Sequence, residues 1–508
     1  MKFLISGICI GILAIGFAAC DNGGNSNGGG TPEPDQKQAE DTNTAPDVAT
    51  TGPMVIQLDC SDAIDALYGD PGILPDEKGA IIFCAADGTL TAADIDTELA
   101  AAGYDGPAAT SGATMYRILY ATQRGNGDLG ASAALVFLPD TPPADIMPMV
   151  VASHGSRGQA AKCAPSTGDP AGDYVRDDFI NQVYPMVGYG FPVIAPDLAG
   201  YANFGAEGNP PSAYAHALDV ARSTLDGARA LRTLIPARLD DQIVLTGHSQ
   251  GGHTALAAAA EAVTYGAGGD VAAVATYAPL WLPARSWGAL FLLADAYPIA
   301  EVASVNAVTI WYHYTHAELY DGPGAGRLLF AAEHQDTIQD FVEGSCWSSS
   351  YPTLEAAATV VTELFDPAFV SAVMIPAATG QPCSKDEPAK TVCETWLERY
   401  AADRPHFTGA LAEVPQLVVY GGLDTTIPPD RIMCALDRLE TDGVNSTQCF
   451  DPLGTHGSIV ANQSDYVVQW IASKTLGTEL SETCPSDEIL LLDGDGDPIA
   501  CNNIPPND

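Results

Sequence analysis

The sequence predicts an α/β protein, with a mainly parallel sheet covered by helices on both faces and an inserted, mostly helical cap. Short continuous apolar runs alternate with segments that carry apolar residues at helical spacing. Continuous apolar runs are typical of strands that are buried on both faces of a parallel sheet. The alternation stops at about residue 283 and resumes after about 410, which indicates an insertion within one sheet domain.

Each element of the first part follows from its residues. Met115–Tyr120 and Ala133–Leu138 are expected to be strands, and the Gly- and Asn-rich loop between them favours an antiparallel pair. Four buried strands are expected at 148–153, 191–195, 243–246 and 271–277. Three helices are expected at 179–188, 217–235 and 254–263.

The interrupted region, 283–410, is rich in aromatic residues and prolines, and 354–365 is helix-like. A strand at 415–420 and a helix at 459–472 then resume the sheet pattern. We therefore expect a sheet domain in two parts, 54–282 and 411–478, with the cap between them and a separate tail at 479–508.

The chain is strongly acidic. Its 508 residues include 64 acidic and 21 basic side chains, for a net charge of −43. A polyanion would be repelled, so nucleic acid is not an expected partner. The acidity is typical of a well-hydrated, soluble surface.

The first 19 residues form an export signal, with Lys2 before an apolar run from Phe3 to Ala19. Their end, GFAAC, resembles the signal of bacterial lipoproteins, which implies cleavage before Cys20 and lipid attachment to it. The alternative is an ordinary signal peptide cut near Ala19 and a secreted product. Residues 20–53 are rich in Gly, Asn, Pro and acid, and are expected to be a disordered tether. We expect a protein anchored to the cell envelope on its extracytoplasmic side.

Twelve cysteines occur, and ten remain after Cys9 and Cys20 are set aside. In an exported chain an even number favours disulfides, and the absence of a CxxC pair among the ten disfavours a zinc ribbon. Sequence does not fix the pairing, so neighbours along the chain are first guesses. They are Cys60–Cys84, Cys383–Cys393, Cys434–Cys449 and Cys484–Cys501.

The stretch Gly247-His248-Ser249-Gln250-Gly251 fits the pattern G-x-S-x-G between an expected strand and an expected helix. In a nucleophile elbow of this kind, the serine occupies a strained turn and the glycines avoid collisions with neighbouring backbone. Ser249 is therefore the candidate nucleophile. The alternative is a Gly-rich structural turn with a bystander serine.

A nucleophilic serine needs a base, and the base needs an orienting acid. After such an elbow the expected order is Ser, then Asp or Glu, then His. His456, in a loop of small residues, is the only histidine beyond the resumed strand, and Asp424 follows that strand directly. These two residues are our candidates for base and acid; the alternative acids are Asp430, Asp437 and Asp451.

An oxyanion is held by backbone N–H donors. One should come from Gln250, the residue after the nucleophile. The other should come from the loop after strand 148–153, where His154-Gly155 precedes Ser156. Ser156 is the candidate and Arg157 the alternative, unless the loop is only a structural turn.

These motifs resemble the α/β-hydrolase superfamily, and more narrowly the secretory lipase family and its bacterial relatives. Three stretches carry the resemblance: His154-Gly155 with Cys163-Ala-Pro-Ser166, Gly247–Gly252, and Tyr420–Asp424 before Gly454–His456. The resemblance implies an α/β-hydrolase fold, carboxylic-ester hydrolysis through an acyl-enzyme, and no cofactor for catalysis. It also implies a Cys163–Cys346 disulfide. The anchor, the acidity and the tail depart from the fungal members.

Two weaker signals remain. Asp493, Asp495 and Asp497 alternate along the tail, in a stretch that resembles the excalibur calcium-binding motif, so Ca²⁺ is a candidate ligand of these three residues. The alternative is an acidic, disulfide-closed loop that binds no metal. His313 and His316 could share one helix face and bind a metal, but packing within the cap is favoured.

The sequence thus predicts a serine hydrolase, a lipase or esterase that acts on an ester-containing lipid or small molecule. A serine peptidase or amidase on the same fold is one alternative. A surface-binding protein that has lost activity is another.

Overall fold

The computed structural model describes residues 52–167, 176–201, 209–281 and 285–484. The proposed signal, Cys20 and the carboxylates Asp493, Asp495 and Asp497 lie outside the described residues. No helix in the described part of the chain is both long enough and apolar enough to cross a membrane.

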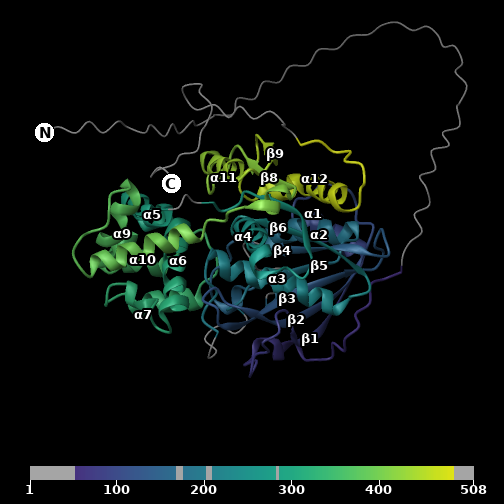
Figure 1. Ribbon diagram of the computed structural model, residues 1–508, viewed down its shortest axis with the longest axis horizontal. Helices are drawn as coiled ribbons and strands as arrows, with labels where there is room; N and C mark the ends of the chain where they lie inside the picture. The colour runs from purple at the N-terminus through teal and green to yellow at the C-terminus, as the bar shows by residue number, and fades with distance from the viewer. Residues whose placement is uncertain (1–51, 168–175, 202–208, 282–284, 485–508) are drawn as a thin grey trace, which may run out of the picture. The chain divides into compact units, whose positions relative to one another are not determined.

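One mainly parallel sheet of nine strands organises the chain (Figure 1). Its order is β1-β2-β3-β5-β4-β6-β7-β8-β9. The pairs from β1 to β5 are antiparallel and those from β5 to β9 are parallel, so the predicted sheet type is confirmed. The strands are β1 Ile81–Leu90, β2 Ala113–Gln123, β3 Leu129–Pro139, β4 Met147–Ser153, β5 Val193–Pro196, β6 Leu239–His248, β7 Asp270–Tyr277, β8 Gln416–Gly421 and β9 Ser446–Asp451.

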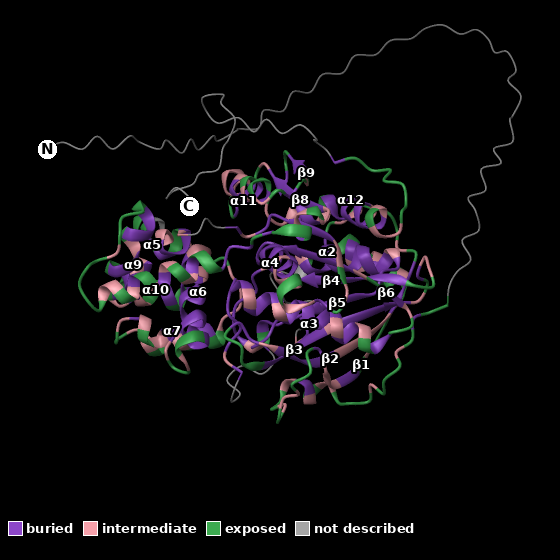
Figure 2. Cartoon of the chain, viewed as in Figure 1, coloured by how far each residue is buried: buried purple, intermediate pink, exposed green. Residues whose placement is uncertain are grey.

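Helices cover both faces of this sheet, as the sequence predicts. Helices α3 (Ala217–Leu234) and α4 (Gln250–Tyr265) pack together on one face. Helices α1 (Ala92–Ala101), α2 (Arg176–Tyr189) and α12 (Ser458–Thr475) pack on the other, while α11 (Pro429–Thr441) contacts β8 and β9. Every residue of β4, β5 and β8 is consequently buried, which explains their continuous apolar runs (Figure 2).

The cap is a helical insertion between β7 and β8 with a hydrophobic core of its own (Figure 1). Its helices are α5 Ser286–Ala296, α6 Ala303–Asp321, α7 Gln335–Gly344, α8 Pro352–Ala357, α9 Pro367–Thr379 and α10 Ala389–Ala402. Aromatic side chains dominate that core, including the fully buried Trp311 and Phe365. Tyr214 and Ala215 of the sheet domain join the same cluster, so the two parts share an apolar contact.

Short 3₁₀ helices connect these elements: η1 Ile64–Tyr68, η2 Ala161–Cys163, η4 Ile299–Glu301, η5 Arg327–Leu329, η6 Val361–Glu363 and η7 Gly409–Glu413. One of them corrects the sequence analysis. The helix-like pattern at 354–365 is split between α8 and η6. The Glu363 carboxylate accepts the backbone N–H groups of Thr359 and Val360, which starts a new turn instead of continuing the helix.

The disulfides confirm some of the expected pairs and overturn others. Cys60–Cys84 and Cys383–Cys393 are present, and so is the Cys163–Cys346 bond between the sheet domain and the cap. The expected pairs Cys434–Cys449 and Cys484–Cys501 are wrong, because Cys449 is bonded to Cys484. The segment after α12 returns to β9, which makes Cys484 the spatial neighbour of Cys449 despite a sequence separation of 35.

Candidate active site

Ser249 is the single residue between strand β6 and helix α4, and its backbone conformation is strained. Its φ is 57° and its ψ is −118°. A residue with a side chain pays a free-energy cost for positive φ, so surrounding contacts must impose it. The Ser249 N–H donates to Tyr277 O at 2.9 Å, and its carbonyl accepts the Leu280 N–H at 2.8 Å.

The neighbouring glycines allow the close approach that this turn requires. A Cβ on Gly247 would overlap the carbonyl of Gly251, and a Cβ on Gly251 would overlap the carbonyl of Ser153. A Cβ on Gly252 would lie 2.7 Å from Pro279 Cα. The glycines of the motif are therefore needed for backbone packing, as expected for a nucleophile elbow.

Asp424 and His456 meet at the ends of two neighbouring parallel strands. Asp424 follows β8, His456 follows β9, and His456 Nδ1 lies 2.7 Å from Asp424 Oδ2. The other carboxylate oxygen, Oδ1, accepts the N–H groups of Thr426 and Ile427, both at 2.8 Å. These bonds hold the carboxylate in one orientation. The Nδ1 proton of His456 is therefore directed at Asp424, which leaves Nε2 to act as a base.

The acid and base loops touch through their backbones. The Leu423 N–H donates to Gly454 O at 2.9 Å, and a Cβ on Gly421 would overlap that same carbonyl. In the described structure, none of the alternative acids Asp430, Asp437 and Asp451 is paired with His456. The Asp451 carboxylate instead accepts the Leu453 N–H at 3.0 Å.

Ser249 and His456 line one cleft of about 670 Å³. His154, Gly155 and Ser156 of the loop after β4 line it as well. Asp424 is buried behind His456, with its side chain 1% exposed against 19% for the histidine. The structure therefore places the candidate nucleophile and base in one accessible space, with the candidate acid on the protein side of the base.

Of the two candidate oxyanion donors, Gln250 directly follows Ser249 in the chain and Ser156 lines the same cleft as Ser249. Gln250 is the first residue of α4, a position where helix N–H groups have no intrahelical acceptor. Ser156 lies in the loop after β4, and its hydroxyl is 2.7 Å from the Tyr214 hydroxyl. The alternative donor, Arg157, accepts the Trp347 N–H of the cap through its carbonyl at 2.8 Å. The cap thus contacts the loop after β4 directly.

One ion pair beside the site was not foreseen from the sequence. His248 Nδ1 lies 3.3 Å from Asp178 Oδ2, and its Nε2 donates to the carbonyl of His456 at 2.9 Å. Burial would lower the pKa of His248, but the charge and hydrogen bond of Asp178 raise it above its ordinary value. Nothing in the sequence pointed to this pair except that Asp178 stands in the first turn of α2, where an acidic residue is favoured.

Other histidines occupy structural positions. His313 Nε2 lies 2.8 Å from the Tyr400 hydroxyl and His316 Nε2 lies 2.7 Å from Asp403 Oδ2, so these two residues of α6 do not share a ligand position. His216, His316 and Asp403 form one buried cluster with the composition of a metal site. Its ring nitrogens and carboxylate oxygens already have protein partners: Asp219 N and Tyr320 at His216, Tyr312 O and Asp403 at His316, and Ala217 N and Tyr312 at Asp403.

Comparisons with known proteins agree with this architecture. The rice cell wall degrading esterase LipA from Xanthomonas oryzae superimposes with a TM-score of 0.56, at 17% identity over 79% of this chain and 99% of LipA. Candida antarctica lipase A in its closed state gives a TM-score of 0.57, at 16% identity over 86% of this chain and 92% of the lipase. Neither a protein-family model nor a curated protein matches the sequence. The chain has the α/β-hydrolase fold.

Proposed function

We propose that this protein is a serine carboxylic-ester hydrolase of the lipase and esterase type. The observation that carries the proposal is the His456–Asp424 pair at 2.7 Å, in the same cleft as a serine held at positive φ. Two similar structures are described as an esterase and a lipase, in keeping with this reaction.

The chemistry follows from the arrangement. His456 Nε2 removes the proton of Ser249 Oγ, which attacks the ester carbonyl and forms a tetrahedral oxyanion. The backbone N–H groups of Gln250 and Ser156 hold that oxyanion, each contributing about 3 kcal/mol. The alcohol leaves with the proton from His456, and water then releases the acid by the same route in reverse. Asp424 keeps the imidazole in the correct tautomer throughout.

The test is a substrate panel on the purified protein beside Ser249→Ala. We expect Ser249-dependent hydrolysis of nitrophenyl esters and labelling of Ser249 by a fluorophosphonate. Cleavage of aminoacyl anilides without ester cleavage would favour the peptidase or amidase alternative instead. A folded protein that turns over neither class, and takes no label, would be a binding protein.

We also propose that the protein is exported and lipid-anchored through Cys20. The disulfides are compatible with an oxidising, extracytoplasmic compartment. Metabolic labelling with palmitate should mark the wild type and not Cys20→Ser; equal labelling of both would contradict the anchor. Calcium binding by Asp493, Asp495 and Asp497 is likewise a proposal, and isothermal titration with Ca²⁺ beside their triple Asn variant tests it.

A further inference from the structure

The cleft around Ser249 is poor in aliphatic surface. Among the described residues that line it there is no Val, Leu, Ile or Met, and the only large apolar side chains are Phe179 and Trp347. A long acyl chain gains free energy only by burying its methylene groups against apolar atoms. The lining thus offers little gain to such a chain.

The same walls are rich in hydrogen-bond acceptors. Asp177 and Asp178 of α2 and Glu301 of η4 contribute carboxylates, and Ser304 and Ser348 contribute hydroxyls from the cap. These groups come from both the sheet domain and the cap, so they surround the space. Carboxylate oxygens accept hydrogen bonds and donate none when ionised. Arg157, Gln182 and Asn462 line the same cleft and add N–H donors, so these walls suit a ligand that both donates and accepts hydrogen bonds, as hydroxyl groups do.

One acceptor at the cleft is buried and unsatisfied. Asn181 lines the cleft and is 3% exposed. Its Nδ2 donates to Ala102 O at 2.9 Å, whereas its Oδ1 has no hydrogen-bond partner among the described residues. A buried acceptor without a partner costs free energy, which a hydroxyl donor on a ligand would recover if a small side-chain movement brought it within reach of Oδ1.

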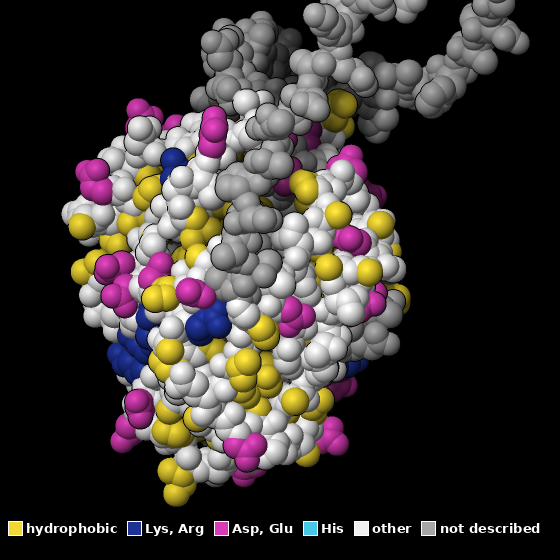
Figure 3. Space-filling model, turned by 90° about the vertical axis from the view of Figure 1, so that its right-hand side faces the viewer, with side chains coloured by type: hydrophobic (Ala, Val, Ile, Leu, Met, Phe, Trp, Pro, Cys, Tyr) yellow, Lys and Arg dark blue, Asp and Glu magenta, His cyan; other side chains and the backbone are white. Residues whose placement is uncertain are grey.

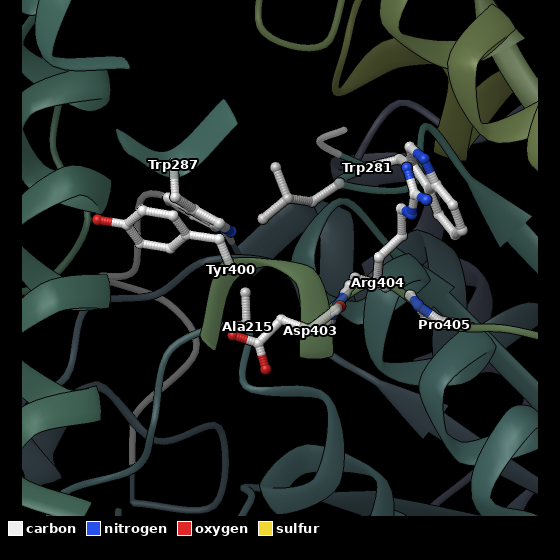
Figure 4. A pocket seen from close by; sticks show the side chains of 9 residues that line it. Ala215, Trp281, Trp287, Tyr400, Asp403, Arg404 and Pro405 are labelled. Atoms are coloured by element: carbon white, nitrogen blue, oxygen red, sulfur yellow. The ribbon is translucent and has the colours of Figure 1, made fainter. Parts of the chain in front are cut away.

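The space on the other side of the elbow is closed. Figure 4 shows it between Trp287 and Tyr400 of the cap and Ala215 and Trp281 of the sheet domain. Its volume of about 10 Å³ is room for about one water molecule, too little for an acyl chain. This space is therefore too small for an acyl chain, whereas the cleft that Ser249 lines is large enough for a substrate.

Resting on the proposed ester hydrolysis, we infer that the substrates are esters of short-chain acids with uncharged, hydroxyl-rich alcohols of the sugar type. The hydroxyls donate to the carboxylates and to Asn181 Oδ1, while the short acyl group needs no aliphatic pocket. A quaternary ammonium alcohol such as choline matches the negative charge but has no N–H or O–H to satisfy Asn181 once esterified.

The test compares alcohols at constant acyl group and acyl groups at constant alcohol, using the full chain. We expect kcat/KM for 6-O-acetylglucose to exceed that for hexyl acetate and for acetylcholine at least 10-fold. Across nitrophenyl esters we expect a fall of at least 10-fold from acetate to octanoate. A preference for hexyl acetate, acetylcholine or octanoate would overturn the inference and leave the esterase function intact. No Ser249-dependent turnover of any ester would overturn both.

Three matched variants test whether residues of the cleft determine the preference for a hydroxyl-rich alcohol. Asp177→Leu changes an exposed carboxylate of the cleft, Asn181→Leu removes the buried acceptor, and Glu479→Leu changes an exposed carboxylate outside the cleft. The readout is the ratio of kcat/KM for acetylglucose to that for hexyl acetate, which does not depend on the folded fraction. We expect the ratio to fall at least fivefold in the first two variants and to be unchanged in the third. An unchanged ratio in both cleft variants would contradict the inference.

Discussion

Two histidine–carboxylate pairs in this molecule have the same contact distance and different surroundings. His456 and Asp424 lie 2.7 Å apart at the cleft, and His316 and Asp403 lie 2.7 Å apart between the sheet domain and the cap. The His456 side chain is 19% exposed and that of His316 is fully buried. His316 Nδ1 is also bonded to the Tyr312 carbonyl, at 2.7 Å, whereas His456 Nε2 has no partner in the described part of the chain.

The difference concerns the second ring nitrogen, which a histidine needs if it is to act as a base as proposed for His456. Both carboxylates orient an imidazole, but both ring nitrogens of His316 are bonded within the protein, whereas His456 lines the cleft that Ser249 also lines. Asp403 holds three segments together, because its oxygens accept from Ala217 N and from the Tyr312 hydroxyl, and its carbonyl lies 2.7 Å from His253 Nε2. The distance within such a pair is therefore less informative than the surroundings of the second nitrogen.

The largest expected contrast comes from removing each histidine. In His456→Ala we expect kcat/KM for an ester to fall roughly a million-fold, as when a member of such a triad is lost, with little change in stability. In His316→Ala, Asp403 loses its buried partner, so we expect about 3–5 kcal/mol of lost stability and nearly normal kcat per folded molecule. Ester hydrolysis and denaturant unfolding measure both. A large loss of kcat in folded His316→Ala would contradict the structural role of His316.

The carboxylates should divide in the same way. Asp424→Asn keeps the shape but removes the acceptor that fixes the tautomer of His456, so we expect kcat to fall about 10⁴-fold. Asp403→Asn should leave kcat within about threefold and lower stability by about 1–3 kcal/mol through unsatisfied buried groups. Single-turnover rates and thermal unfolding of the two variants test this division, which equal activity losses would contradict.

As the pH is lowered, we expect the buried histidines His216 and His154 to reduce the stability of the fold at a higher pH than the buried carboxylate of Asp403 does. Burial lowers the pKa of His216 to about 4, and burial with Arg157 lowers the pKa of His154 to about 4. The unfolded chain then binds more protons below pH 6.5, so stability falls as pH drops from about 6.5 to 4, by up to about 1.4 kcal/mol per pH unit for each group. Unfolding midpoints at pH 7, 6 and 5 measure the slope, which His216→Asn should reduce.

Asp403 should respond at lower pH. Burial would raise its pKa, but His316 and His216 lower it to about 2. A depressed carboxyl pKa stabilises the fold above the ordinary Asp value, and that contribution is lost as pH falls from about 4 through 2. A stability curve that is flat between pH 6.5 and 4 would contradict this order.

The smallest expected effect concerns the hydrogen bond from His248 to the backbone carbonyl of His456. His248→Phe removes the donor to the His456 carbonyl, and we expect kcat to fall about 10- to 100-fold with KM nearly unchanged, because His456 loses its position. His248→Gln keeps an N–H donor and should recover part of the rate. Equal rates in Phe and Gln variants would show that the hydrogen bond does not position His456.

The sequence predicted those elements that depend mainly on their own residues. The apolar run Pro148–Ser153 and the motif around Ser249 specify a buried strand and a sharp turn through their own residues, and the structure contains both. Strand β1 was missed, because Ile81–Leu90 is a sheet edge with irregular register and mixed burial, which leaves no clear periodicity. The acidity of the surface was also predicted from composition. Figure 3 shows acidic side chains spread over the visible face, with most of the fewer Lys and Arg side chains toward the left.

Contacts between distant residues were not predictable from sequence. The partner of His456 could be proposed because chain order limits the choice, whereas His316 and Asp403 are 87 positions apart and belong to no motif. Asp178 is 70 positions from His248, and the partner of Cys449 depends on the path of the chain after α12. Such pairings follow from tertiary packing, which no short stretch encodes.

The Cys163–Cys346 bond has a consequence for how substrate enters. Cys163 follows the loop after β4 that contains Ser156, Cys346 precedes Trp347, and Gly158 and Cys346 form a β-bridge. This wall of the cleft is thus covalently tied to the loop after β4, so we expect it not to swing away as a hinged lid. Turnover of a dissolved ester should follow a smooth saturation curve, without a jump at the concentration where the ester begins to form micelles.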